Sequence, residues 1–112
     1  MACIFCQIAK GEIPSRFLYQ DEEVYAIRDI SPKAPTHVLI IPLAHIPAAT
    51  DVTLQDARVL GKMVLVAAQL AQREGLAGRG YRLIINNGPD AGQVVQHLHL
   101  HLLGGRPLGD MG

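Results

Sequence analysis

The sequence has no net charge, no long hydrophobic run and only two cysteines, and each shortage excludes a class of protein. Ten lysines and arginines balance ten aspartates and glutamates, so the overall charge does not favour nucleic acid or an anionic membrane as a partner. No stretch approaches the roughly 18 apolar residues of a membrane span, and the N-terminus lacks the basic and apolar regions of a secretion signal. We therefore expect a cytoplasmic protein that binds neither nucleic acid nor membranes.

Repeats, low-complexity tracts and linkers are also absent, which indicates a single domain over residues 1–112. The chain has 112 residues, of which 49% are hydrophobic, and this is enough to bury one core without disulfides. The two cysteines, Cys3 and Cys6, are separated by two residues. In a reducing compartment this spacing favours metal binding or redox chemistry over a structural disulfide.

The hydrophobic pattern predicts strands, one long helix and then further strands. Apolar residues recur at helical spacing from Thr53 to about Glu74, and Thr53 with Asp56 has the spacing of an N-terminal cap. Short links between neighbouring strands indicate an α+β fold, with a mainly antiparallel sheet of about five strands and one long helix. The strands are expected over residues 16–20, 23–30, 37–42, 80–87 and 94–105. In residues 23–30 the alternation of side chains predicts a half-buried hairpin strand.

Three histidines alternate with leucines near the end of the chain, at His97, His99 and His101. On a strand the three imidazoles would share one face, while the leucines point to the core. Polar surface positions filled by chance are disfavoured, because histidine is neither a strong strand former nor a common solubilising residue. One ion bound by all three is disfavoured too, because positions 97 and 101 lie about 13 Å apart on a regular strand. Acid–base or nucleophilic catalysis by one imidazole remains, and it requires an anion-binding loop nearby.

A glycine-containing loop over residues 88–93 precedes this strand. Gly88 and Gly92 permit positive φ, so the amides of Gly92, Gln93 and Val94 could face a phosphate without any basic side chain. Taken alone, such a loop is more often a simple turn. Its position beside the histidines favours the phosphate-binding interpretation.

Residues 97–103, HLHLHLL, resemble the signature of the histidine triad (HIT) family of nucleotidyl hydrolases and transferases, in which histidines alternate with apolar residues. The resemblance extends over IFCQIAKGEIPS, DISPKAPTHVLIIP, the central helix and AGQVVQHLHLHLLGGRP, and the LLGGRP ending is similar to the Hint branch. It implies a purine nucleoside phosphoramidase-like nucleotidyl hydrolase that cleaves at the α-phosphorus through a nucleotidyl-histidine. It also implies a homodimer and no organic cofactor.

The resemblance implies a role for each matching residue. His99 matches the nucleophile, His101 the histidine that hydrogen-bonds the phosphate, and His37 a buried histidine that orients the triad. Asp29 matches the acceptor of the ribose hydroxyls, although from sequence alone it is more readily a turn cap. The phosphate contacts would come from Asn86 and the backbone of Gly92, Gln93 and Val94, and the base pocket would be walled by Phe5, Ile8, Ile27 and Ile30. Those four apolar residues would serve equally as plain core.

Val94 departs from the family pattern, since many Hint-type members carry a serine or another polar side chain there. Its amide can still bind phosphate, but donation from the side chain to the leaving group is lost. Positioned proton donation is typically worth about 10² to 10⁴ in rate. Slow turnover or an altered leaving-group preference is therefore a hypothesis for this chain.

The resemblance also gives the cysteines a role, because some histidine triad proteins hold a structural zinc with a C-x2-C pair and two histidines. The four matching residues here are Cys3, Cys6, His45 and His97. Such a site has no open position for a reacting water, so the zinc would be structural. The alternative is two free buried cysteines with His45 on the surface. A competing function is a zinc-stabilised nucleotide-binding or partner-binding module with little turnover.

Overall fold

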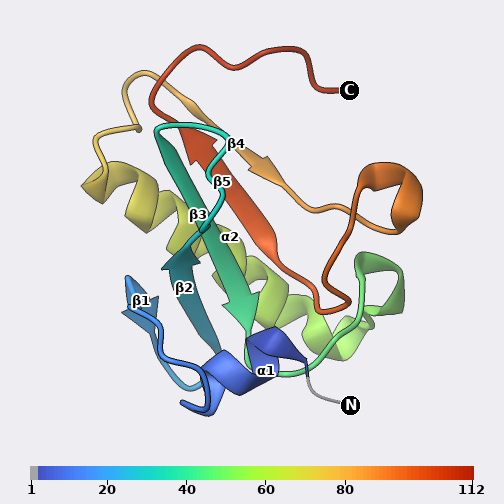
Figure 1. Cartoon of the computed structure of the whole chain (residues 1–112). Helices are drawn as coiled ribbons and strands as arrows, with labels where there is room; N and C mark the ends of the chain where they lie inside the picture. The colour runs from blue at the N-terminus through green and yellow to red at the C-terminus, as the bar shows by residue number, and fades with distance from the viewer. Residues whose placement is uncertain (1–2) are drawn as a thin grey trace.

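One antiparallel sheet of five strands, in the order β1-β2-β3-β5-β4, has the long helix α2 across one face in the computed structural model (Figure 1). The structure describes residues 3–112; residues 1 and 2 of the predicted domain lie outside it. The elements are α1 (Ile4–Ala9), β1 (Tyr19–Gln20), β2 (Val24–Arg28), β3 (Thr36–Pro42), α2 (Ala57–Arg73), β4 (Tyr81–Ile84) and β5 (Leu100–Gly104), with single 3-10 turns at Ala49–Asp51, Leu54–Asp56 and Pro89–Ala91. The predicted α+β fold with a mainly antiparallel sheet and one long helix is confirmed.

The long helix begins after the cap that the sequence predicts. The side chains of Thr53 and Asp56 form a capping box around the 3-10 turn that leads into α2. Ion pairs then join the helix to the β1–β2 turn, because Lys62 Nζ lies 2.6 Å from Asp21 and 2.9 Å from Glu23. The Lys62 ammonium and hydrogen bonds from Tyr19 and backbone amides hold the pKa of Asp21 well below its usual range, against the effect of burial. No helix within residues 3–112 is both long and apolar enough to cross a membrane.

The strand predicted over residues 94–105 is shorter than expected, since β5 begins only at Leu100. In the β3–β5 register Pro42 would lie opposite Leu98, but proline has no N–H to continue the ladder. The Leu98 amide instead donates to the Ile46 carbonyl at 2.6 Å. Residues 95–97 form a bend, so His97 and His99 precede the strand and only His101 lies on it.

The sheet is buried on both faces in its centre, which corrects the half-buried strand expected at residues 23–30. On the α2 face, Val24 and Ala26 pack with Leu98, Leu100 and Leu102 against the helix. The opposite face carries a second apolar cluster over which α1 lies, formed by Phe5, Ile8, Tyr25, Ile27, Leu39 and Ile41. The leucines between the histidines therefore anchor the main core, as predicted, and the histidines lie on the α1 side of the sheet.

Helix α1 was not expected from the sequence. It spans six residues and has no side-chain hydrogen bond at its N-cap, Cys3. A single apolar turn of this length has too little periodicity to separate it from a loop. Its Phe5 and Ile8 are buried in the second cluster.

Candidate active site and metal centre

A cavity of about 310 Å³ lies on the α1 face of the sheet, and its wall is mostly apolar. It brings together residues predicted as base pocket, ribose contact, phosphate loop and histidine pair. The predicted residues that line it are Phe5, Ile8, Ile27, Asp29, Ile30, Asn86, Gly92, Val94, His99 and His101. The lining residues that the sequence did not indicate are Ile4, Arg28, Leu39 and Val95. Gln93 and His37 lie outside the lining.

The His99 ring is oriented by the backbone of the preceding histidine. Its Nδ1 lies 2.7 Å from the His97 carbonyl oxygen, and a carbonyl accepts only, so Nδ1 carries the proton in this hydrogen bond. In the neutral ring, Nε2 then holds a free lone pair. The Phe5 ring packs edge-on against His99 with centroids 5.1 Å apart. His99 therefore presents an unprotonated nitrogen from a fixed ring.

His37 and His101 form a hydrogen-bond chain, and a backbone amide at its start determines which nitrogen of each ring carries the proton. The Lys33 amide donates to His37 Nδ1 at 3.0 Å, so in neutral His37 the proton is on Nε2. That nitrogen lies 2.9 Å from His101 Nδ1, which therefore accepts, leaving the His101 proton on Nε2. Burial lowers the pKa of both rings, that of His101 to about 4 with added repulsion from His99 and His37. His101 is thus a neutral N–H donor at the cavity.

Asp29 combines the two roles considered for it. Its Oδ1 accepts the Ser31 amide at 2.8 Å, which makes it a turn cap. Its Oδ2 lies 3.4 Å from His37 Nε2, and the side chain also lines the cavity. Turn capping fixes the carboxylate at the edge of the apolar wall, where it is available as an acceptor.

The loop before the histidines is held by its own hydrogen bonds. Gly88 and Gly92 both have φ of +85°, which a residue with a side chain would adopt only with strain. The amides of Gly92 and Gln93 already donate to Pro89 and Gly88. The buried Gln93 side chain accepts from the Gly88 amide at 2.9 Å and donates to the Pro47 carbonyl at 2.9 Å. Gln93 thus closes the loop. The Gly92 and Gln93 amides could contact a phosphate only while also donating to the loop carbonyls.

Val94 follows this loop at the mouth of the cavity. Its side chain is 87% exposed, and its amide makes no hydrogen bond to another residue in the part of the chain that the structure describes. The amide is therefore free for an anion. The exposed apolar side chain contributes no donor beside it.

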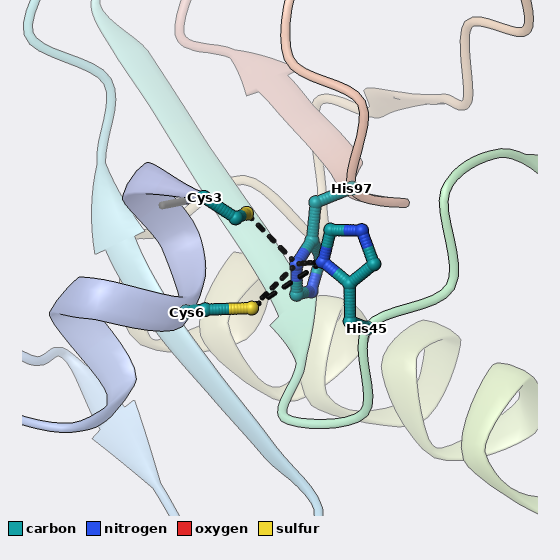
Figure 2. Close-up of side chains that lie close together, drawn as sticks. All are labelled: Cys3, Cys6, His45 and His97. Atoms are coloured by element: carbon teal, nitrogen blue, oxygen red, sulfur yellow. Dashed lines mark hydrogen bonds between the residues drawn. The ribbon is translucent and has the colours of Figure 1, made fainter. Parts of the chain in front are cut away.

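The four predicted metal ligands converge at one point (Figure 2), with all four donor atoms within 4.8 Å of one another. The Cys3 and Cys6 sulfurs each lie 3.3 Å from an imidazole Nδ1, of His97 and His45 respectively. Cys6 Sγ is 3.6 Å from His97 Nδ1, and the two Nδ1 atoms are 3.1 Å apart. Donor atoms around a tetrahedral zinc are separated by about 3.3 to 3.8 Å, so the cluster has the dimensions of such a site.

The position of the proton on the His97 ring is also the one that a metal ligand requires. Its Nε2 donates to the Pro42 carbonyl at 2.8 Å, which leaves Nδ1 unprotonated and pointing at the two sulfurs and His45. His97 is completely buried, and burial lowers its pKa, so the ring stays neutral. Burial also raises the pKa of the Cys6 thiol, whose proton a metal would displace.

Asp29, His37 and His101 form a second group of metal-ligand types. Here, however, the His37 proton lies between the two imidazoles, and the His101 Nδ1 lone pair accepts it. These atoms are already satisfied by each other. Hydrogen bonding therefore accounts for the arrangement of Asp29, His37 and His101 without a metal.

The comparisons with known proteins agree with this geometry. The HIT domain model matches residues 10–108. The chain is 56% identical to a purine nucleoside phosphoramidase of Escherichia coli K12 over 108 residues, which covers 96% of this chain and 91% of that protein. Among solved structures, a HIT family hydrolase from Legionella pneumophila has a TM-score of 0.94 and 49% identity, covering 96% of each chain.

A zinc-bound histidine triad family protein from Mycobacterium smegmatis has a TM-score of 0.81 and 35% identity, covering 99% of this chain and 79% of that one. The HIT domain model begins after α1 and spans the whole sheet, α2 and the histidine segment. The family model and the relatives together show that the chain belongs to the HIT family.

Proposed function

We propose that the protein is a cytoplasmic hydrolase of purine nucleoside phosphoramidates, or of related nucleotidyl esters, with His99 as the nucleophile. The observation that carries this proposal is the His99 ring, which lines the cavity and is held by its Nδ1 to the His97 carbonyl. Supporting it is the 56% identity to the Escherichia coli purine nucleoside phosphoramidase.

The cavity offers a place for each part of a nucleotide. The apolar walls of Phe5, Ile8 and Ile27 suit a purine base, and Ile30, which is 99% exposed, extends that wall outward. Asp29 accepts the ribose hydroxyls at the edge of the wall. The α-phosphate then lies toward His99, within reach of Asn86 and the free Val94 amide.

The chemistry proceeds in two displacements. His99 Nε2 attacks the α-phosphorus, forming a P–N bond to the ring as the P–N bond of the substrate breaks and the amine leaves with a proton taken from solvent, to which the second step returns one. Water then attacks the nucleotidyl-histidine, releasing the nucleoside monophosphate and restoring the neutral imidazole. His101 Nε2–H hydrogen-bonds the phosphate oxygens without carrying a charge, and His37 holds it in that tautomer.

The metal centre is proposed to be a structural zinc site formed by Cys3, Cys6, His45 and His97. Two thiolates and two imidazoles are a closed donor set that leaves no position for a reacting water. When bound, the ion supplies a cross-link between α1, the loop after β3 and the segment before β5.

We also propose a homodimer. Val64 and Leu65 on α2 are about half exposed, and Tyr81 lies partly exposed on β4, one of the two edge strands of the sheet. An unpaired edge strand next to an apolar helix surface is suited to contact with a second copy. Light scattering after gel filtration would give twice the 12.1 kDa chain mass; a mass of one chain at micromolar concentration would contradict the dimer.

Turnover of a fluorogenic adenosine phosphoramidate tests the function directly. The parent should release the fluorophore far faster than His99→Ala, and rapid quenching with labelled substrate should trap an adduct on His99. Near-background rates for both proteins would contradict hydrolysis. If the parent shows only background turnover but still binds AMP, the alternative function, a nucleotide-binding module with little turnover, is the better description.

A further inference from the structure

Helix α1 faces the metal centre and the nucleotide cavity at the same time. Cys3 and Cys6 are one helical turn apart and point to the two histidines (Figure 2). The residues between and after them, Ile4, Phe5 and Ile8, line the cavity. One short helix therefore supplies two metal ligands and part of the proposed base pocket.

Little else holds this helix. Its six residues are far fewer than an isolated helix needs for stability, and the N-cap side chain, Cys3, makes no capping hydrogen bond to the helix backbone. The remaining anchors are the burial of Phe5 and Ile8 and one hydrogen bond of 2.8 Å from the Tyr25 hydroxyl to the Phe5 carbonyl. A metal bound by Cys3 and Cys6 would thus contribute a large part of the restraint on the cavity wall.

The histidine side of the metal centre is connected to the nucleophile as well. His97 offers Nδ1 to the metal, while its main-chain carbonyl accepts the His99 Nδ1 proton at 2.7 Å. The Phe5 ring packs edge-on against both imidazoles, with centroids 5.7 Å from His97 and 5.1 Å from His99. Restraining α1 and His97 therefore restrains the ring of His99 from two sides.

We propose that the metal centre and the nucleotide cavity are energetically coupled through α1, so that Cys3 and Cys6 are positioning residues for nucleotide binding. Metal binding orders the cavity wall before the nucleotide arrives, and nucleotide binding in turn favours the metal-bound arrangement. The coupling rests on the proposed function for the identity of the ligand, a purine nucleotide. It concerns affinity, and it assigns the ion no part in the chemical step.

The test is a calorimetric titration of AMP into the full chain, first loaded with zinc and then stripped by a chelator. Coupling between sites is typically 5- to 150-fold in affinity, and we expect a change of about tenfold or more in favour of the zinc-loaded protein. Reciprocity requires that saturating AMP tighten zinc binding by the same factor. Zinc competition with a chromophoric chelator measures that second affinity without any variant.

Two variants of α1 form a matched pair. Cys6→Ser removes one donor and should bind AMP like the stripped protein, whatever zinc is added. Gln7→Ala lies on the same helix but neither lines the cavity nor belongs to the metal cluster, so its AMP affinity should still depend on zinc. Hydrogen exchange should show α1 amides losing protection on stripping while α2 stays protected.

Equal AMP affinity within twofold for loaded and stripped protein would overturn the coupling and leave the proposed hydrolase intact. Loss of protection across α2 and β3 on stripping would also overturn the route through α1, because the metal would then support the whole fold. Failure of the loaded parent both to bind AMP and to cleave the phosphoramidate would overturn the proposed function and the coupling together.

Discussion

The three histidines of residues 97–101 belong to two clusters and differ in what occupies each ring nitrogen. His97 belongs with Cys3, Cys6 and His45 to the metal cluster, whereas His99 and His101 line the cavity and form the cavity cluster. In the metal cluster, His97 donates from Nε2 to a carbonyl, so that its Nδ1 lone pair is free and faces two sulfurs. In the cavity, His99 donates from Nδ1, so that its Nε2 lone pair is free. His101 accepts at Nδ1 and keeps a proton on Nε2.

The difference shows that the neighbour of one nitrogen decides the use of the other. A backbone carbonyl beside Nε2 leaves the Nδ1 lone pair for a metal, a carbonyl beside Nδ1 leaves the Nε2 lone pair for attack, and a histidine donor beside Nδ1 leaves an N–H on Nε2. Substitutions of the metal-site residues should therefore act mainly on stability and nucleotide affinity, whereas substitution of His99 should act mainly on turnover.

The largest expected effect is on turnover and comes from His99→Ala. Removing a nucleophile from a covalent mechanism should lower kcat/KM for the adenosine phosphoramidate by at least about 10³-fold. Zinc content and Tm should remain close to those of the parent, because His99 is neither a metal ligand nor fully buried. If the kcat/KM of His99→Ala were within tenfold of that of the parent, His99 would not be the nucleophile.

The same substitution two residues earlier, His97→Ala, should mainly reduce stability. It opens a cavity at a completely buried side chain, leaves the Pro42 carbonyl without its donor and removes one of the proposed metal ligands. Together these should cost about 3 to 5 kcal/mol, or roughly 10 °C or more in Tm. Denaturant unfolding of the His97→Ala and His99→Ala proteins side by side measures the contrast, and equal midpoints would contradict it.

At the mouth of the cavity, Val94→Ser should raise kcat by about 100-fold for substrates with poor leaving groups. A hydroxyl there restores a donor beside the phosphate, and the lower end of the range for proton donation applies because position 94 is exposed. Val94→Ala serves as the control, since it shortens the side chain without adding a donor. An unchanged kcat across several leaving groups would show that the apolar residue imposes no limit.

The most gradual effect is a pH dependence of stability from the cavity cluster. Burial lowers the pKa of His101 from 6.5 to about 4, so below pH 6.5 the unfolded chain takes up a proton that the folded protein does not. The stability that neutral His101 contributes is therefore complete above pH 6.5 and is lost as the pH falls toward 4, at no more than about 1.4 kcal/mol per pH unit.

The control for this pH dependence is His101→Asn, which has no titrating group at that position. Urea unfolding at matched zinc content should show a shallower loss of stability for this variant than for the parent between pH 6.5 and 4. Parallel curves for the two proteins would mean that His101 does not contribute to acid destabilisation.

The sequence predicts the elements whose signals are local. The capping box at Thr53 and Asp56, the long helix and the alternation of leucine with histidine all follow from side-chain spacing, and the structure has each of them. The convergence of Cys3, Cys6, His45 and His97 was reached through the family resemblance, because nothing local relates residues 3 and 97.

Other features depend on tertiary contacts and were missed for that reason. Helix α1 is one apolar turn that is held by the second cluster, so its own sequence carries little signal. The late start of β5 depends on which residue of β3 lies opposite Leu98, and pairing register is not visible in residues 94–105 alone. The closing role of Gln93 likewise depends on the Pro47 carbonyl, 46 residues away in the chain.

The proline at the end of β3 has a consequence beyond the length of a strand. Because Pro42 offers no amide to the neighbouring chain, its carbonyl is left for a side chain, and the His97 ring takes it. If the sheet continued by one more residue pair, the Pro42 carbonyl would accept a main-chain hydrogen bond, and the His97 ring would lose its partner. In this protein a gap in main-chain pairing is what allows three alternating histidines to take three different partners.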